Sequence, residues 1–243
     1  GTGSNVIYGD AGDDSITGST TTGQDTLDGG DGADTINAGI GANLILGGAG
    51  ADSINANAGD DTIDAGADND LVLAGDGADL ITGGSGNDTI TGGTGADTVA
   101  LADGSGLDTI TDFDMTDAGA GFTVDQLDVS ALTDAEGNPV NAWDVTVSDD
   151  GSGNAVLTFP NGDTVTLLGV APAQLDKAPE LHSIGIPCFA EGTRIATPGG
   201  MKLVEALQPG DLVNTRDGPP EPVVWIGARM VGPEELAADP ALR

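Results

Sequence analysis

Residues 29–100 read GGDGADTIN AGIGANLIL GGAGADSIN ANAGDDTID AGADNDLVL AGDGADLIT GGSGNDTIT GGTGADTVA, which is eight consecutive units of nine residues. The units share the pattern GGxGxDxUx, where U is a large aliphatic residue, and no insertion interrupts them. The eighth position is apolar in every unit: Ile36, Ile45, Ile54, Ile63, Val72, Ile81, Ile90 and Val99. A column of this kind faces a common core. The pattern therefore predicts a repeat structure with one short strand per unit.

The sixth position carries oxygen-bearing side chains throughout. It is Asp34, Asn43, Asp52, Asp61, Asp70, Asp79, Asp88 and Asp97 in the eight units, and the fourth position is glycine everywhere except at Asp68. Residues 9–17 form a further full unit, residues 18–28 a stretched one, and residues 103–111 repeat the pattern after a two-residue offset. These outer units add Asp14, Asp25 and Asp108 to the column. A column of carboxylates thus runs beside a column of glycines.

The three-residue xUx segment has room only for a brief strand, whereas GGxGx demands positive φ and close backbone approach, which glycine permits. Strand and tight turn should alternate every nine residues. The repeats resemble the RTX, or haemolysin-type, calcium-binding nonapeptides over nearly half of the chain. The resemblance implies an all-β fold in which residues 1–111 form a parallel β-roll, a β-solenoid with two units per turn and calcium in its glycine-rich corners.

With two units per turn, alternate units stack, so Asp34, Asp52, Asp70 and Asp88 share one edge while Asn43, Asp61, Asp79 and Asp97 share the other. Neighbouring carboxylates about 4.8 Å apart repel by roughly 3.5 kcal/mol at an effective dielectric of about 20. We therefore expect the roll to need a cation. The alternative is a disordered, solvated tract, which we expect only without calcium.

Calcium suits the corners because it accepts six to eight oxygen ligands, backbone carbonyls included, whereas magnesium demands near-octahedral geometry. An EF-hand is excluded, since Glu136 is the only glutamate before residue 177. The expected side-chain ligands of several calcium ions are Asp14, Asp25, Asp34, Asn43, Asp52, Asp61, Asp70, Asp79, Asp88, Asp97 and Asp108. The expected carbonyl ligands are Gly30, Gly32, Gly48, Gly50, Gly84, Gly86, Gly93 and Gly95.

The chain carries 40 acidic and 6 basic side chains in 243 residues, and no Lys or Arg precedes Lys177. This field repels nucleic acid and anionic membranes, and no apolar run is long enough to cross a bilayer. The single Cys excludes a disulfide framework. The family resemblance implies a type I secretion apparatus as partner and an extracellular or cell-surface location. Extracellular modules bind calcium at about 10⁻⁴ to 10⁻³ M, so the roll should fold on leaving a low-calcium cytosol.

Residues 112–176 predict an antiparallel β segment that caps the roll. Alternating strands are expected at residues 108–113, 126–130, 143–148, 155–159 and 164–170, and the last three should form a meander because turn residues join them. We expect Trp143 in the core of this segment, with a carbohydrate or partner surface as the alternative. Residues 177–187, which contain the only histidine, His182, read as a linker.

The stretch CFAEGTRIATPGGMKLVEALQPGDLV, starting at Cys188, resembles the opening of a Hint domain, the hedgehog and intein fold, so residues 188–243 form a truncated Hint-like β segment. In that family the first cysteine attacks the preceding carbonyl, which makes Cys188 the candidate nucleophile and Pro187–Cys188 the scissile bond. The alternative is that Cys188 is a small, buried apolar side chain and not a nucleophile. No histidine follows Cys188 and no asparagine follows Asn214, so the residues that activate such a thiol are missing.

The sequence favours a calcium-binding module rather than an enzyme, attached to the start of an autoprocessing domain. A self-cleaving Hint protein in a longer parent chain is the first alternative. A calcium-dependent adhesin or surface-layer subunit is the second, and the sequence leaves the oligomeric state open.

We expect the 243-residue chain not to cleave itself, because the activating residues of the Hint reaction are missing. Intact-mass spectrometry after prolonged incubation at neutral pH should show one species. Spontaneous products of residues 1–187 and 188–243 would refute this expectation.

Overall fold

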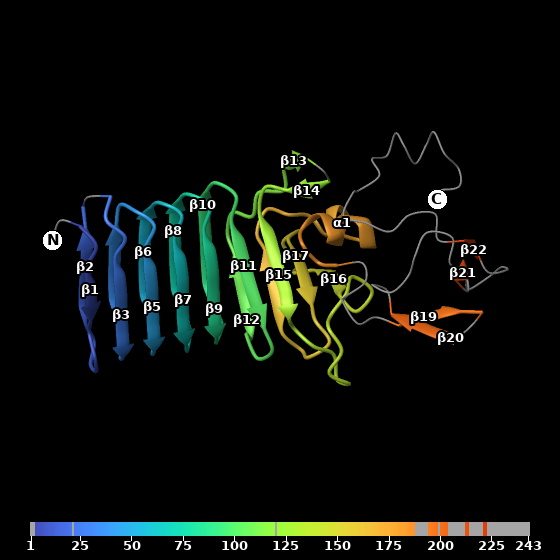
Figure 1. The fold of residues 1–243 in the computed structure, drawn as a ribbon, viewed down its shortest axis with the longest axis horizontal. Helices are drawn as coiled ribbons and strands as arrows, with labels where there is room; N and C mark the ends of the chain where they lie inside the picture. The colour runs from blue at the N-terminus through green and yellow to red at the C-terminus, as the bar shows by residue number, and fades with distance from the viewer. Residues whose placement is uncertain are drawn as a thin grey trace.

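The computed structural model describes residues 3–20, 22–119, 121–187, 194–198, 200–203, 212–213 and 221–222. Twelve short strands make up the repeat region: β1 (Val6–Tyr8), β2 (Ser15–Ser19), β3 (Thr26–Asp31), β4 (Thr35–Gly39), β5 (Leu44–Ala49), β6 (Ser53–Ala58), β7 (Thr62–Ala67), β8 (Leu71–Asp76), β9 (Leu80–Ser85), β10 (Thr89–Thr94), β11 (Thr98–Ala102) and β12 (Leu107–Ile110). Odd-numbered strands pair in one parallel sheet and even-numbered strands in another. Leu44 lies beside Thr62, one full turn of 18 residues later, so two units make a turn and the predicted parallel β-roll is confirmed (Figure 1).

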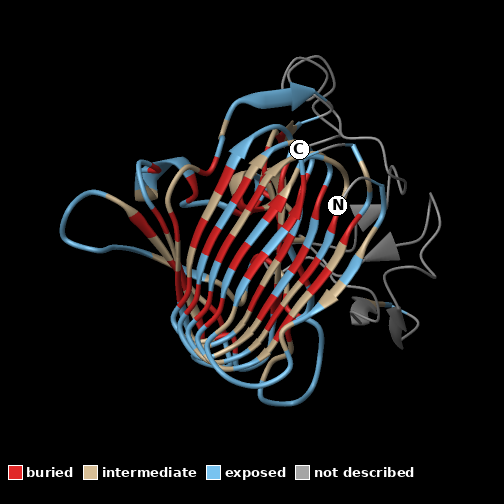
Figure 2. Ribbon diagram, turned by 90° about the vertical axis from the view of Figure 1, so that its left-hand side faces the viewer, coloured by how far each residue is buried: buried red, intermediate tan, exposed pale blue. Residues whose placement is uncertain are grey.

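The roll's core lies between the two sheets. From β2 to β12 the second and fourth residues of each strand are buried, and these positions line up from strand to strand (Figure 2). Eighth-position residues such as Ile45 and Ile81 are fully buried. The first position also faces the interior, which the sequence analysis missed. In the eight units this position holds only alanine or glycine. At Gly47 even a methyl group is too large, because a Cβ there would lie 2.2 Å from the carbonyl oxygen of Ala65.

The corners of the roll depend on left-handed backbone at the second and fourth positions of the unit. Gly48 and Gly50 have φ of 110° and 117°. A Cβ on Gly48 would lie 2.0 Å from the Gly30 carbonyl oxygen of the preceding turn. Where glycine is replaced at these positions, Asn or Asp takes its place, as at Asn57 and Asp68, since these residues tolerate the left-handed region.

The segment after the roll contains β13 (Asp117–Gly119), β14 (Phe122–Thr123), β15 (Gln126–Ala131), β16 (Thr146–Asp149), β17 (Ala155–Thr158), β18 (Thr164–Leu167), the 3₁₀ helix η1 (Pro172–Gln174) and α1 (Ala178–Ser183). We call residues 112–187 the cap. The expected antiparallel meander is present as β16, β17 and β18. However, β15 pairs in parallel with β11, and β18 pairs in parallel with β12. The cap therefore extends both sheets of the roll by one parallel strand each.

Two expectations for the cap are wrong. Trp143, expected in the core, is 71% exposed, while Phe113 and Phe159 fill the interior instead. Residues 177–187, expected to be a linker, contain α1 and bury Leu181 and Ile184 completely or nearly so. Pro179 lies in the first turn of this helix, where proline needs no backbone donor, so it starts a helix here and does not mark a linker.

Beyond the cap, β19 (Arg194–Thr197) pairs with β20 (Gly200–Leu203), and β21 (Leu212–Val213) pairs with β22 (Glu221–Pro222), both antiparallel. Cys188 lies outside the described residues. Among those residues, no helix is long and apolar enough to span a membrane.

Replacing Ile81 with Ala should lower the free energy of unfolding in calcium by about 2 to 5 kcal/mol, because Ile81 is fully buried and the sheets cannot close over the cavity. Leu80, its neighbour on β9, is 43% exposed on the opposite face, and Leu80→Ala is the matched control, expected within about 0.5 kcal/mol of wild type. Denaturant unfolding measures both. Equal losses would contradict the assignment of the inner face.

Candidate metal centre

Sixth-position side chains form two ladders, one along each edge of the roll. In each ladder the Oδ1 atom accepts the backbone N–H of the sixth-position residue one turn earlier, for example Asp34 N to Asp52 Oδ1 at 2.8 Å. The first ladder is Asp14, Asp34, Asp52, Asp70, Asp88 and Asp108. The second is Asp25, Asn43, Asp61, Asp79, Asp97 and Asp125. The edge sharing expected from two units per turn is therefore present, and Asp125 is a rung that the sequence analysis missed.

The second carboxylate oxygen of most rungs is buried without a partner. The unpartnered Oδ2 atoms belong to Asp14, Asp34, Asp52, Asp61, Asp70, Asp79, Asp88 and Asp97. No ion pair among the described residues includes them, because both ion pairs there involve Lys177 in the cap. A buried polar atom without a partner costs about 1 to 3 kcal/mol, and a charged one costs more. Eight such oxygens in two lines need either protons or a metal ion.

The asparagine units show what surrounds these oxygens. Asn43 Nδ2 donates to the carbonyl oxygen of Gly41, the fourth-position residue of its own unit, at 2.7 Å. Asn5, at the sixth position of the partial first unit, donates in the same way to Gly3 at 2.7 Å. In an aspartate unit the isosteric atom is Oδ2, which has no proton to donate to the fourth-position carbonyl. A cation can take both oxygens as ligands.

The carbonyl groups at the second and fourth positions differ in their backbone bonding. Asp10, a second-position residue, already accepts the amide of Asp31 from the next turn at 2.8 Å. The fourth-position carbonyls are the ones that the asparagine side chains select. Of the eight predicted carbonyl ligands, we therefore expect Gly32, Gly50, Gly86 and Gly95 to be better ligands than Gly30, Gly48, Gly84 and Gly93. The same expectation extends to Gly12, Gly59 and Gly77, which share the fourth position but were not among the predicted ligands.

The second ladder ends in two carboxylates, Asp25 and Asp125, whose oxygens are both satisfied by backbone amides. Asp25 accepts the amides of Asn5 and Ser19 at 2.7 and 2.6 Å. Desolvation raises the pKa of Asp25, but the hydrogen bonds from Asn5 and Ser19 outweigh it and lower the pKa overall. Asp125 accepts amides from both the roll and the cap, at Asp97 and Asp114. Such carboxylates need no ion, so Asp25 is a weaker ligand candidate than the sequence suggests.

Other rungs of both ladders titrate in the direction opposite to Asp25, and burial raises the pKa of the end rung Asp125 as well. Burial raises the pKa of Asp61 and Asp70 to about 7, and repulsion from the next carboxylate in the ladder, Asp79 or Asp88, adds to this. Burial likewise raises the pKa of Asp97 to about 6 and that of Asp108 to about 7. The metal-free roll therefore retains protons that the unfolded chain has lost at neutral pH.

Within the described part of the chain, no three His, Cys, Asp or Glu side chains converge on one point. Each corner offers one carboxylate per turn together with main-chain carbonyls. Calcium fits this donor set, because it accepts carbonyl oxygens and irregular geometry, whereas zinc prefers nitrogen and sulfur ligands.

The repeat region and the C-terminal region each match a known protein-family model. The RTX calcium-binding nonapeptide repeat model matches four stretches, at residues 1–20, 19–45, 38–72 and 73–110. A Hint domain model matches residues 187–243. Among curated proteins, no sequence matches the chain.

Solved structures similar to the chain include two subunits of a mannuronan C5-epimerase from Azotobacter vinelandii. AlgE6R2 is 23% identical, with 75% of this chain and 94% of that chain covered and a TM-score of 0.33. AlgE6R3 is 26% identical, with 67% and 74% covered and a TM-score of 0.26. The extracellular lipase LipA from Serratia marcescens is 18% identical, with 69% and 37% covered and a TM-score of 0.29.

Without metal, the roll should be more stable at pH 5 than at pH 8. The folded-state pKa values of Asp61 and Asp70 are about 7, above the ordinary value of 3.8, so the folded form binds more protons between these limits and its stability falls as pH rises. The lowered pKa of Asp25 acts only below about pH 4. Far-UV circular dichroism of chelator-treated protein measures the trend, because the fraction of folded roll should be larger at pH 5 than at pH 8. A β signal that increases from pH 5 to pH 8 would contradict it.

Proposed function

We propose that this chain, which carries RTX calcium-binding nonapeptide repeats at residues 1–110 and a Hint domain match at residues 187–243, is a secreted module that folds when calcium fills its corners. The supporting observation is the set of eight buried Oδ2 atoms without partners. The proposed ligands are these oxygens and the fourth-position carbonyls of the same units.

Each calcium ion would offset both the burial of an unpartnered carboxylate oxygen and the repulsion between carboxylates of neighbouring turns. Bound calcium supplies positive charge and empty coordination positions to oxygens that otherwise face only other acceptors. The carboxylates hold one turn to the next through Oδ1 and the backbone, so neutralising them removes the repulsion that opposes stacking. Asn43 is a poor ligand in this scheme, because its own amide already bonds the Gly41 carbonyl.

The expected calcium dependence of folding supports secretion. A roll whose interior carboxylates remain uncompensated should stay unfolded where calcium is scarce and fold where it reaches about 10⁻⁴ to 10⁻³ M. An unfolded chain with no base among its first 176 residues suits export through a type I secretion apparatus. We place the folded module outside the cell or at its surface.

Autoprocessing is a second candidate function, favoured by the Hint domain match at residues 187–243. We propose it only for a longer parent chain, with Cys188 as the nucleophile. The activating histidine would have to come from residues not present here.

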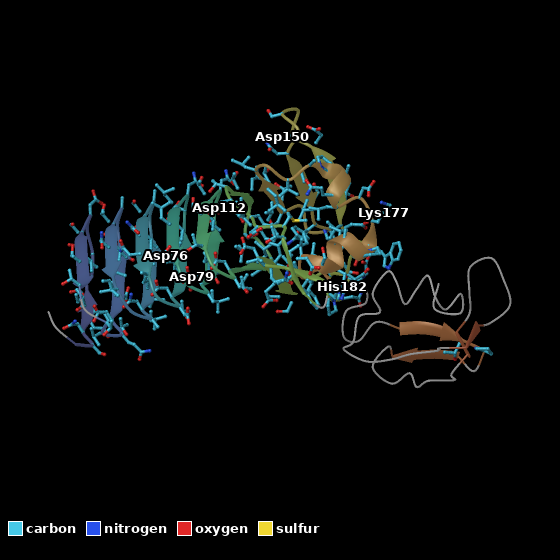
Figure 3. The ribbon with its side chains drawn as sticks, turned by 90° about the horizontal axis from the view of Figure 1, so that it is seen from above. Asp76, Asp79, Asp112, Asp150, Lys177 and His182 are labelled. Carbon is cyan, nitrogen blue, oxygen red and sulfur yellow. The ribbon has the colours of Figure 1, made fainter. Side chains whose placement is uncertain are left out.

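Calcium titration of the full chain by far-UV circular dichroism, with magnesium as the control ion, tests the proposal. Asp79 and Asp76 both lie on the roll (Figure 3), but Asp79 is 2% exposed with an unpartnered Oδ2, whereas Asp76 is exposed and accepts the Thr94 hydroxyl. Asp79→Asn should raise the calcium concentration at the midpoint several-fold, because a ligand oxygen is lost. Asp76→Asn should leave it unchanged.

A β signal that does not respond to calcium would overturn the proposed function. Equal midpoint shifts in the two variants would instead show that the sixth-position column does not supply the ligands. In Asp79→Asn, the metal-free form should also gain β signal, since its amide can bond the Gly77 carbonyl as Asn43 bonds Gly41.

A further inference from the structure

The four residues before Cys188 are held against the roll's last strand in the odd-numbered sheet. Leu127, on β15, donates its amide to the Ile184 carbonyl at 2.7 Å. Ala142 donates its amide to the Pro187 carbonyl, also at 2.7 Å. Ile184 and Ile186 are fully buried. We call residues 184–187 the junction segment, because the Hint domain match begins at residue 187.

The fit of the junction segment requires a glycine. Gly185 has a φ of 102°, and a Cβ at this position would lie 2.2 Å from the Leu127 carbonyl oxygen. No side chain can occupy that space unless the segment moves away from β15. The preceding residue is held as well, since Gln126 Nε2 donates to the Ser183 carbonyl at 2.9 Å.

The strand that receives the junction segment, β15, belongs to the cap but extends the odd-numbered sheet of the roll. Residues of β15 pair in parallel with β11, Val99 beside Leu127. The corner before β15 contains the last rung of a carboxylate ladder, where Asp125 accepts the Asp97 amide at 3.0 Å. If the ladder does not stack, β15 has no neighbour to pair with, and the junction segment loses the edge on which it lies. Lys177 and His182, which lie within or next to α1, mark this end of the molecule in Figure 3.

We propose that the calcium-folded roll anchors the entry to the Hint domain, so that the Pro187 carbonyl is held by the Ala142 amide only when calcium is bound. This inference rests on the proposed calcium-dependent folding. We call this calcium-sensitive arrangement of the junction segment the clasp. In it the cap positions the first carbonyl of the Hint match, that of Pro187, because the Ala142 amide donates to it and polarises it. Any acyl transfer at this carbonyl in a longer parent chain is then restricted to the calcium-bound, folded state.

Hydrogen exchange by NMR on the full chain tests the clasp through the two amides that hold it, those of Leu127 and Ala142. In calcium both should exchange slowly, and without calcium both should exchange at least tenfold faster. In Gly185→Ala they should exchange at least tenfold faster even in calcium, while the Asp79 amide inside the roll and the calcium-induced circular dichroism stay as in wild type.

Gly153→Ala is the matched control. Gly153 has a φ of 96°, similar to that of Gly185, but a Cβ there meets nothing within 4 Å, so this variant carries the backbone strain without the clash. It should behave as wild type. Gln126→Met is the second test variant, because it removes the shorter of the two hydrogen bonds to the Ser183 carbonyl, the other coming from Thr123 Oγ1, without adding bulk to the backbone. It should also speed exchange at Leu127 and Ala142.

The outcomes separate the clasp from the folding proposal. If the roll responds to calcium but the Leu127 and Ala142 amides exchange alike with and without it, the clasp is overturned and calcium-dependent folding stands. Slow exchange at both amides in Gly185→Ala and Gln126→Met also overturns the clasp. If the circular dichroism of the chain does not change with calcium, both proposals are overturned.

Discussion

The structure depends on a carboxylate that has one oxygen bonded and one oxygen free. In each interior aspartate, Oδ1 accepts the amide of the preceding turn, which fixes the stacking distance and the register. The same contact draws Oδ2 into the corner, away from water and from any donor. The interaction that assembles the roll thus creates the charge that opposes it. A cation resolves this conflict, which is why the repeats combine dense acidity with an apolar column.

Glycine sets the geometry in which that conflict arises. At the second and fourth positions the backbone is left-handed and the carbonyl of the preceding turn occupies the place of a Cβ. At the first position the interior admits only hydrogen or methyl, so the core consists of one large column and one small column. The roll is consequently thin. Stabilisation by apolar burial is limited by the side chains that fit, and the corners carry a larger share of the stability than they do in a thicker fold.

Regular parts of the molecule could be predicted from the sequence, because a fixed period specifies both burial and register. The aliphatic column, the two ladders and the parallel sheets all follow from the spacing of residues such as Ile81 and Asp79. The cap was harder, because its strands each occur once. The sequence analysis expected only antiparallel strands there, although residues 125–128 and 163–166 repeat the DxUx part of the unit, without its glycine-rich corner, at the two strands that pair in parallel with the roll. Trp143 and residues 177–187 could not be placed, since their burial depends on a packing surface that no local pattern encodes.

Asn43 is the one asparagine among the aspartates of the second ladder, from Asp25 to Asp125. Its amide bonds the Gly41 carbonyl and so satisfies this corner of the folded roll without an ion. A stacked array of repeats behaves as a one-dimensional lattice with nearest-neighbour coupling. In that description Asn43 is a site that needs no ion, and it separates the rungs with an unpartnered oxygen, Asp61, Asp79 and Asp97, from the satisfied end at Asp25. One of the two edges of the roll therefore contains a corner that needs no ion, and the stacking of turns can propagate from this corner along the roll.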